Sequence, residues 1–387
     1  MNSIESKLLD RRQFLKLSTG STAALVLGFC WPLSGKDSLS DEDVIFVPNA
    51  YLKIHANDTV SVIMPRSEMG QKIYTALPQI VAEELEADWS KIKVIQGDLN
   101  QVYGSQTTGG SASVRTQYDR LRKAGATAKA MLIQAAATTL NVPGSEFYAE
   151  SGFVHHSGSN RKLSFGSLVA MANTLPVPTD VILKDPKTFR IIGKAYKSLD
   201  GIGKVEGSIK FGYDFELPEM LTAVVERIPK YGGSMSSFDA TEALKVPGVI
   251  KIAPISAGVA VLADNSWAAL QGRKKLEVKW NDGPHAKLNS KKISEDFKAA
   301  LEQDGSIIRS EGNAEEALKT AKQQIELTFE VPYLDHAPQE PNNCTAHIHD
   351  GICEIWAPTQ NPGAAWWAAK SVTEFADDNI KVHTLRM

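Results

Sequence analysis

Residues 60–95 read VSVIMPRSEMGQKIYTALPQIVAEELEADWSKIKVI, and this stretch decides the expected fold. It begins with an apolar run at Val60–Met64 and continues through a polar loop. Apolar residues then recur at helical spacing over Ile73–Leu85, and a second apolar run follows at Ile92–Ile95. Asn57-Asp58, just upstream, predicts a hairpin with an earlier strand. The order strand, loop, helix, strand is the beginning of a layered α/β domain.

A loop of small residues follows, and residues 104–113 read GSQTTGGSAS. A helix is predicted after it, at about Val114–Leu140, with Ser111 or Ser113 in position to cap the helix. Exposed backbone N–H groups and the helix dipole favour an anion at such a site. An ordinary flexible loop has the same composition, so the sequence alone leaves both interpretations open.

From Val205 to Trp280 the pattern changes to short strands, which predicts a small α+β module. The strands are expected at Leu221–Arg227, Val249–Ile252, Val259–Leu262 and Leu276–Trp280. A short helix is expected at Phe238–Leu244, ended by Pro247-Gly248. Residues 282–325 are polar and partly helical, which is typical of a connector.

Asp350-Gly351 predicts a second hairpin near the end of the chain. Side-chain alternation gives this hairpin an apolar face made of Cys344, Ala346, Ile348, Cys353, Ile355 and Ala357. His347 and His349 fall on the other face with Glu354 and Trp356. We expect no mixed Cys/His zinc site, because the thiols and imidazoles point apart. The cysteines are out of register for a disulfide, so we expect two buried thiols and histidines at the surface or a subunit contact.

The N-terminal segment has the pattern of an export signal. Arg11 and Arg12 precede a modest apolar run at Ala23–Leu33, as in substrates of the twin-arginine (Tat) route. We therefore expect a periplasmic protein that is exported folded, with membrane association left open. The formal net charge of −3 gives no indication of nucleic-acid binding. After the signal only Cys344 and Cys353 remain, and an iron–sulfur cluster usually needs four cysteines.

Three loops together resemble a known family. The loop Glu68–Gln71, the loop Thr108–Ser113 and the stretch from Tyr333–Pro338 to Thr359–Asn361 are similar to motifs of the xanthine dehydrogenase/aldehyde oxidase family of molybdenum hydroxylases. In most of that family the first two motifs lie late in the large subunit. Their early position here, after a Tat signal, resembles the branch that contains the beta subunit of isoquinoline 1-oxidoreductase.

The resemblance implies a mixed α/β (α+β) fold, with a layered molybdopterin-binding domain and an inserted α/β hammerhead-like module. The expected divisions are a signal peptide at 1–35, a linker at 36–47, a molybdopterin-binding domain at 48–200, the hammerhead-like module at 201–285, a connector at 286–325 and the start of a second molybdopterin-binding region at 326–387.

The resemblance also implies a set of cofactor-binding residues. Gln71, preceded by Gly70, matches a glutamine that contacts the pterin, and Gln360 matches one beside the apical oxygen of molybdenum. The small-residue loop that receives the pterin is matched by Gly109, Gly110, Ser111 and Ser113. Loops favour polar residues in any case, so the pattern is equally that of ordinary loop amides at Gln71 and Gln360. The cofactor implied is molybdopterin with molybdenum, in the cytosine dinucleotide form.

The implied reaction is hydroxylation of an N-heterocycle or an aldehyde, with water as the oxygen source. The implied partners are a small [2Fe–2S] subunit and a cytochrome c as electron acceptor. The family's later glycine-rich loop and its base glutamate have no match, so no catalytic or metal-ligating residue is assigned. We therefore expect this chain alone to be incomplete and inactive. Two alternatives are a non-catalytic exported binding protein that retains the fold, and an unrelated nucleotide-binding enzyme that uses loop 104–113.

Overall fold

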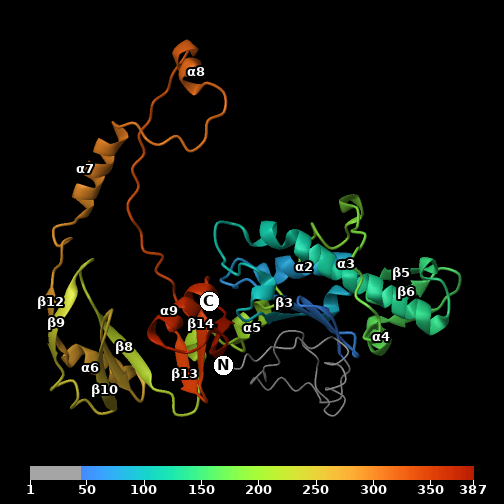
Figure 1. Cartoon of the computed structure of the whole chain (residues 1–387), viewed down its shortest axis with the longest axis horizontal. Coiled ribbons are helices and arrows are strands. Elements are labelled where there is room, and N and C mark those ends of the chain that lie inside the picture. The colour runs from blue at the N-terminus through green and yellow to red at the C-terminus, as the bar shows by residue number, and fades with distance from the viewer. Residues whose placement is uncertain (1–44) are drawn as a thin grey trace, which may run out of the picture. The chain divides into compact units, whose positions relative to one another are not determined.

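The computed structural model describes residues 45–387 of the chain. The expected export signal and most of the expected linker lie outside the described residues. Two compact units are present (Figure 1). The first unit combines residues 45–215 with Pro338–Met387, and the second unit is Glu216–Ala337. The finer division expected for the chain stays a prediction.

The early part of the first unit is a four-stranded sheet with the order β1–β2–β3–β4. Its strands are β1 (Ile45–Asn49), β2 (Leu52–His55), β3 (Val60–Met64) and β4 (Ile92–Gln96). β2 and β3 pair antiparallel. β3 and β4 pair parallel, and helix α2 (Ile73–Leu85) connects them along the chain. The predicted hairpin and the predicted order strand, loop, helix, strand are confirmed, and β1 is a strand that the sequence did not predict.

Helix α3 (Ser113–Leu140) packs on α2 (Figure 1). The two helices approach closely, because a Cβ on Gly125 would lie only 2.5 Å from the backbone oxygen of Val81. Leu77 of α2 and Leu121 of α3 are fully buried in the core beneath them. The remaining elements here are β5 (Phe147–Glu150), β6 (Phe153–His156), β7 (Lys162–Ser164), α4 (Phe165–Ala172) and α5 (Gly201–Glu206).

The C-terminal part of the first unit is a three-stranded sheet with the order β13–β14–β15. Its elements are β13 (Thr345–His349), β14 (Ile352–Pro358), α9 (Pro362–Val372) and β15 (Ile380–Leu385). β13 and β14 form the predicted hairpin, with Ile348 opposite Cys353. β14 and β15 pair parallel, and the side chain of Asn361 caps α9 by accepting a hydrogen bond from Ala364 N.

The apolar face predicted for this hairpin is buried on one strand only. Cys353 and Ile355 of β14 are buried against α9 and β15, but Cys344 is exposed and Ile348 is 60% exposed. The expectation of two buried thiols is therefore wrong for Cys344. Strand alternation fixes which side a residue takes, but not whether another element covers that side. Both cysteines are free, as expected.

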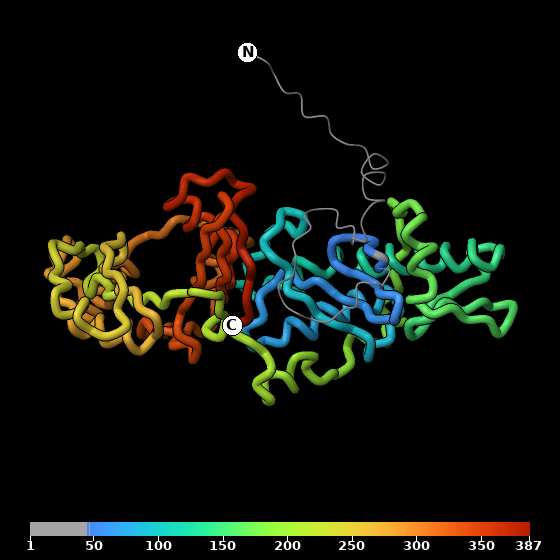
Figure 2. Tube along the Cα trace, turned by 90° about the horizontal axis from the view of Figure 1, so that it is seen from below, coloured from blue at the N-terminus to red at the C-terminus, as the bar shows by residue number. Residues whose placement is uncertain are grey.

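The C-terminal sheet lies beside the early sheet of the first unit. In Figure 2 the red C-terminal segment runs next to the blue early strands, and Leu99 N donates a hydrogen bond to Val382 O at 3.0 Å. Each sheet contains a parallel strand pair joined by a helix, β3–α2–β4 in one and β14–α9–β15 in the other. The predicted motif Glu68–Gln71 lies in the loop after β3, and the predicted motif Thr359–Asn361 lies in the loop after β14.

The second unit contains two small sheets, ordered β10–β11–β8 and β12–β9. Its elements are β8 (Thr222–Arg227), β9 (Ser234–Asp239), β10 (Val249–Ile255), β11 (Gly258–Ala263), α6 (Ser266–Lys275), β12 (Glu277–Asn281), α7 (Ser290–Leu301) and α8 (Ala314–Thr320). The helix predicted at Phe238–Leu244 is wrong, because Phe238 belongs to β9. Asp239 accepts a hydrogen bond from Thr241 N at 2.8 Å, and this local turn ends the strand.

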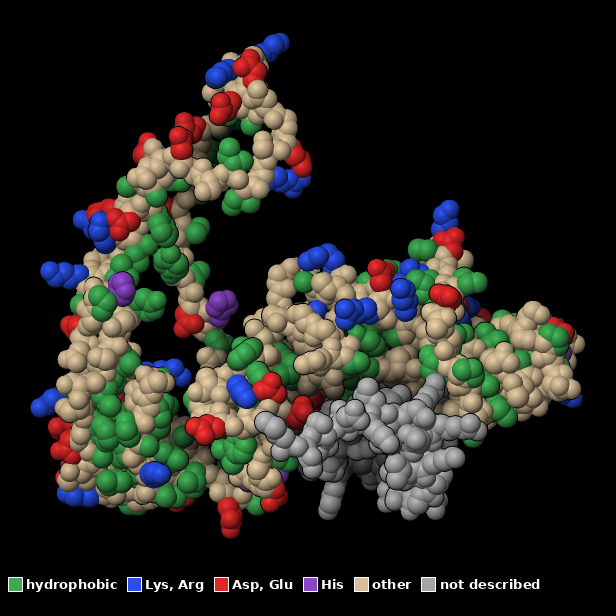
Figure 3. Space-filling model, in the orientation of Figure 1, with side chains coloured by type: hydrophobic (Ala, Val, Ile, Leu, Met, Phe, Trp, Pro, Cys, Tyr) green, Lys and Arg blue, Asp and Glu red, His purple; other side chains and the backbone are tan. Residues whose placement is uncertain are grey.

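An extended stretch of the second unit exposes alternate apolar side chains, as the hydrophobic atoms beside α7 illustrate (Figure 3). These residues are Ile325, Leu327, Phe329, Val331 and Tyr333. Over residues 45–387, none of the helices combines the length and the apolar character that crossing a membrane requires. The mixed α/β fold class predicted from the sequence is confirmed.

Candidate cofactor-binding site

The structure brings together the loop after β3, the loop before α3 and the Thr359–Asn361 end of the third predicted stretch, whereas Tyr333–Ala337 belongs to the second unit. Ser67, after β3, donates from its backbone N to Thr108 Oγ1 at 2.9 Å and from its Oγ to Thr359 O at 2.6 Å. Thr108 N donates to Gln360 O at 2.8 Å, and Gln360 Nε2 donates back to Thr108 O at 2.9 Å. Loops far apart in the sequence are therefore fastened to one another at the carboxyl ends of β3 and β14, where open α/β sheets commonly bind ligands.

A buried carboxylate shapes the loop that follows β3. Glu68 is 1% exposed, and its Oε1 accepts from Gly70 N at 2.8 Å and from Lys72 N at 3.2 Å. Its Oε2 accepts from Tyr74 N at 3.0 Å, in the first turn of α2. Glu68 therefore satisfies N–H groups at a helix start that would otherwise lack partners. These hydrogen bonds give Glu68 a structural role at the start of α2.

Gln71 closes the same loop on itself. Its Nε2 donates to Ser67 O at 2.9 Å, and its Oε1 accepts from Met69 N at 2.8 Å. Its amide is thus engaged within its own loop, and so is the N–H of Gly70. Both residues shape the loop without lining the pocket described below. Their assignment to the cofactor stays a prediction.

The start of α3 differs from the sequence expectation. Its N-cap residue is Ala112, and neither Ser111 nor Ser113 caps the helix, because within the described residues no side chain makes a cap hydrogen bond there. Gly110 and Ser111 have φ values of +57° and +52°, so the chain turns sharply just before the helix. This turn leaves first-turn N–H groups of α3 available to a ligand.

A pocket of about 330 Å³ opens beside this helix start. It is lined by Arg66, Tyr103, Ser105, Thr107, Gly109, Ala112, Thr116, Gln117 and Arg120. Arg66 is buried and donates to Thr107 O and, at 2.8 Å, to Thr116 Oγ1. Arg120 NH1 donates to Tyr103 O at 3.0 Å. Two guanidinium groups therefore border one pocket, with no carboxylate among its lining residues.

Two buried polar atoms of this pocket lack a partner among the described residues. They are Arg66 Nε and Gln117 Oε1. Such atoms carry a free-energy cost unless a ligand or water satisfies them. Burial lowers the pKa of Arg66, the charge of Arg120 lowers it further, and Tyr51 acts in the opposite direction. Burial raises the pKa of Tyr103 to about 12. Even so, an arginine stays charged in a protein, so the pocket presents fixed positive charge and a neutral phenol.

The glycine loop leaves space for a ligand. Among residues 45–387, a Cβ built on Gly109 or Gly110 would meet no other heavy atom within 4 Å, so packing against the described residues requires neither glycine. Open backbone, two guanidinium groups and the unpartnered donor Arg66 Nε fit a polar cofactor that carries phosphates. Gly109 lines this pocket and Gln360 fastens its loop, whereas Gly110, Ser111 and Ser113 stand at its edge.

Sequence reasoning missed Arg66, Gln117 and Arg120. Arg66 immediately precedes the recognised Ser-Glu-Met-Gly-Gln loop, and Gln117 and Arg120 stand three positions apart in the first two turns of α3. Residues with that spacing share a helix face, which is the signal that could have identified them.

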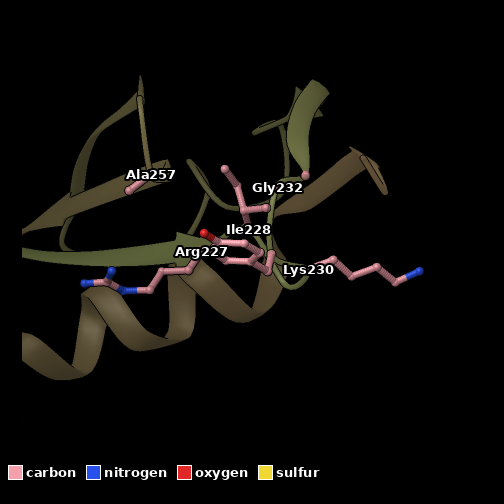
Figure 4. A pocket seen from close by; sticks show the side chains of 7 residues that line it. Arg227, Ile228, Lys230, Gly232 and Ala257 are labelled. Carbon is pink, nitrogen blue, oxygen red and sulfur yellow. The ribbon is translucent and has the colours of Figure 1, made fainter. Parts of the chain in front are cut away.

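A second pocket, in the second unit, does not form a comparable site. It has a volume of about 440 Å³ and is bordered by Arg227, Lys230 and Tyr231. Figure 4 shows the side chains of Arg227 and Lys230 extending away from each other. Lys230 is already paired with Asp282. The two cations do not converge, so they do not form a cradle for one anion.

The fold and the pocket of the first unit define a cofactor-binding domain built at the ends of parallel strands. Two family models, each described as a molybdopterin cofactor-binding domain, match residues 26–215 and 299–387. The chain belongs to the xanthine dehydrogenase/aldehyde oxidase family of molybdenum hydroxylases, a family of enzymes, and the predicted resemblance is confirmed.

Three curated relatives resemble the chain. The beta subunit of isoquinoline 1-oxidoreductase from Brevundimonas diminuta is 30% identical over 98% of the chain, which covers 55% of that protein. The membrane-bound aldehyde dehydrogenase (pyrroloquinoline-quinone) of Gluconacetobacter polyoxogenes is 30% identical over 92% of the chain, which covers 48% of it. One subunit of the nicotinate dehydrogenase of Pseudomonas putida is 29% identical over 83% of the chain, which covers 27% of it.

The chain therefore spans about half the length of the first two relatives. Among solved structures, the aldehyde oxidoreductase of Desulfovibrio gigas aligns with 58% of the chain and the alignment covers 30% of that protein, at 17% identity and a TM-score of 0.41.

Proposed function

We propose that the pocket beside α3 holds the phosphate-bearing part of a molybdopterin cofactor. In this proposal the chain is part of a molybdenum hydroxylase large subunit that acts on an N-heterocycle or an aldehyde. The observation that carries the proposal is the meeting of three loops, joined through Ser67, Thr108 and Gln360, beside a pocket with two guanidinium groups.

The residues of the chain would divide the work of binding. Arg66 and Arg120 supply positive charge toward phosphate oxygens, and guanidinium groups are well suited to phosphate. Gly109 and Gly110 allow close approach of a ligand to the backbone, and the start of α3 supplies N–H donors. Gln360 and Thr108 hold the loop in place. When bound, the molybdenum supplies a two-electron acceptor for hydroxylation with water as the oxygen source.

The finer features of the enzyme are part of the same proposal. The cofactor is the cytosine dinucleotide form, and electrons pass to a small [2Fe–2S] subunit and then to a cytochrome c. The names of two relatives support a partner chain, since each is given as one subunit of its enzyme. The scarcity of cysteine supports placing the clusters elsewhere. Arg11 and Arg12 support export by Tat to the periplasm.

The experiment uses two glycine substitutions that this chain accommodates equally well. Neither Gly109 nor Gly305 has a heavy atom within 4 Å of a built Cβ, and neither has a positive φ. Gly109→Glu brings bulk and negative charge beside the pocket, while Gly305→Glu brings the same change to the second unit. Each whole chain is expressed in a host that makes the molybdenum cofactor. Molybdenum is measured by mass spectrometry and the pterin by fluorescence after oxidation.

We expect Gly109→Glu to lose most of its molybdenum and pterin, while Gly305→Glu retains the parental amounts. Thermal unfolding of the two cofactor-free variants should differ little. Full molybdenum in Gly109→Glu would show that this loop does not receive the cofactor. The same preparations are assayed for pyrroloquinoline quinone, the cofactor in the name of one relative. Quinone without molybdenum in the parental chain would overturn the proposal, and neither cofactor would favour a non-catalytic binding protein.

A further inference from the structure

Three metal-ligating side chains meet on the outer face of the β13–β14 hairpin, apart from the residues of the cofactor pocket. They are His347, His349 and Glu354, and one ligand atom from each lies within 4.8 Å of the others. Strand alternation predicts both histidines on this face, at the surface or at a subunit contact. The mixed Cys/His site rejected there stays rejected, because Cys353 is buried on the opposite face.

The hairpin register explains why these groups converge. His347 is directly opposite Glu354 in the antiparallel pair, and His349 is two positions further along the same strand. Residues two apart on a strand share a face. The rings of His347 and His349 stack with their centroids 4.6 Å apart. Glu354 is buried while His347 is exposed, so the group forms a shallow site that an ion can reach from solvent on the side of His347.

Groups behind Glu354 and His349 hold the orientation of these two side chains. Glu354 Oε1 contacts His383 Nε2 at 3.1 Å, and His383 Nδ1 contacts Asp98 Oδ2 at 3.1 Å. His349 Nε2 lies 2.7 Å from Glu354 Oε2, and its Nδ1 lies 3.4 Å from Asp350 Oδ2. Histidines that bind metals usually direct the second ring nitrogen at a carboxylate or a carbonyl. His349 already has that arrangement, and Glu354 keeps one oxygen for its partner and one for the site.

We propose that His347, His349 and Glu354 bind a zinc ion. Two imidazoles and one carboxylate form a donor set that zinc accepts, with a fourth position left to water or another ligand. Ligand atoms around tetrahedral zinc lie roughly 3.3 Å apart, given Zn–N and Zn–O distances of about 2.0–2.1 Å. The separation of His349 and Glu354 must therefore widen by a few tenths of an ångström. His347, which is exposed, supplies the larger movement.

The site would join the hairpin to the early sheet. Zinc would bind both strands of the hairpin through these three residues, and Glu354 is linked through His383 to Asp98, just after β4. Bound zinc would thus hold together strands that otherwise share little buried surface, because β13 has no buried residue. The proposal does not depend on molybdenum or on the pocket beside α3.

The test is zinc binding by the whole chain, measured by calorimetry after treatment with a chelator. Replacement by cobalt adds a visible absorption spectrum that reports low coordination number and nitrogen ligands. The variants are His349→Ala and His347→Ala. The matched control is His156→Ala. His156 also lies on a strand and contacts a glutamate, Glu146, at 3.0 Å, but it belongs to no such three-residue group in the described part of the chain.

We expect a single zinc ion per chain and a Kd raised at least ~10-fold in either hairpin variant. The control should bind zinc as the parental chain does. Zinc should raise the Tm of the parental chain, but not the Tm of His347→Ala or His349→Ala. Equal loss in His156→Ala, or unchanged binding in both hairpin variants, would overturn the site. His347→Gln, which leaves the buried Glu354 network untouched, guards against loss of folding. Its failure to weaken binding would also count against the proposal.

Discussion

The segments β2–β3–α2–β4 and β13–β14–α9–β15 of the first unit share one topology but differ in burial. Each is an antiparallel hairpin followed by a helix and a parallel strand. In the early segment, α2 has eleven buried residues among thirteen. In the late segment, α9 has only Pro362 and Ala369 buried.

The difference shows that the hairpin, helix and strand of this topology do not by themselves bury the outer face of their helix. Helix α3 covers the early segment by packing on α2, and α3 has several buried alanines. No described element does the same for α9, so Trp367 and Val372 remain exposed. Stability within the first unit should therefore be uneven, with the early segment opening last. The first four predictions can break this comparison, and the fifth sharpens it where the two segments meet.

The largest effect is expected from the buried carboxylate of Glu83 in α2. It accepts from Lys184 Nζ and from Ile191 N at 2.6 Å and Ile192 N at 2.9 Å. Glu83→Ala removes one partner of a buried ion pair and should cost about 3–5 kcal/mol. The counterpart in the late segment is the exposed pair of Lys370 and Asp377, where Asp377→Ala should cost ~0–1 kcal/mol. Urea unfolding monitored in the first unit measures both.

The same carboxylate gives the early segment an acid dependence. Burial alone would raise the pKa of Glu83, but hydrogen bonds from Lys184, Ile191 and Ile192 lower it below its ordinary 4.5. Its stabilisation is therefore present above pH 4.5 and is lost as pH falls through the folded-state pKa. Glu83→Gln should flatten the fall in Tm on acidification. An unchanged acid profile would assign that fall to other carboxylates.

The next effect concerns aliphatic side chains in the two helices. Leu77→Ala in α2 should cost about 2–5 kcal/mol, because Leu77 is 0% exposed and its removal leaves a cavity. Val372→Ala in α9 should change stability by less than ~0.5 kcal/mol, because Val372 is 82% exposed. Equal costs in denaturant unfolding would mean that α9 is covered in solution, and would break the comparison.

A glycine of α3, where it packs on α2, and a glycine of α9 provide a test of sign. Gly125→Ala should destabilise by about 1–3 kcal/mol, because the new Cβ would lie 2.5 Å from Val81 O and push α3 away from α2. Gly363→Ala in α9 meets only Asn361 Oδ1 at 3.4 Å. It should be neutral or stabilise by up to ~1 kcal/mol, because alanine loses less entropy in a helix. Thermal unfolding of the pair decides the matter, and a shared sign would contradict close packing of α2 and α3.

The smallest effect lies where the two segments meet. Gln360→Ala removes one hydrogen bond to Thr108 O and should cost about 0.5–1.5 kcal/mol. Hydrogen exchange should rise at loop 104–113 and stay unchanged in α2. Asn379→Ala, an exposed substitution in the same segment, is the control. Faster exchange throughout the early sheet would mean that the late segment supports the early one more than its burial suggests.

The sequence predicted the elements whose pattern is local. Residues 60–95 carry a hairpin signal and clear helical periodicity, so β3, α2 and β4 were placed correctly. The pairing of Ile348 with Cys353 followed from one turn signal. The short helix at Phe238–Leu244 failed because the side chain of Asp239 ended a strand instead. Helix α6 was missed because its small and basic residues form no apolar stripe.

The residues of the candidate site were likewise predicted only where a local motif indicates them. Loops could be recognised by motif, but Arg66 and Gln117 became site residues only through contacts between distant segments. The exposure of Cys344 was equally out of reach, since it depends on which element covers β13. The cap of α3 failed for a local reason, because the helix begins at Ser113 and its N-cap position is occupied by Ala112, which has no side-chain acceptor.

The paired hydrogen bonds between Thr108 and Gln360 join residues 252 positions apart, and this separation has a consequence for synthesis. Ribosomes add about 5–20 residues per second, so Gln360 is made roughly 13–50 s after Thr108. During that interval the nascent chain holds β1–α3 while the loop beside α3 lacks its anchor. If the pocket beside α3 holds the cofactor as proposed, the loop next to it reaches its anchored geometry only after the loop that follows β14 has left the ribosome.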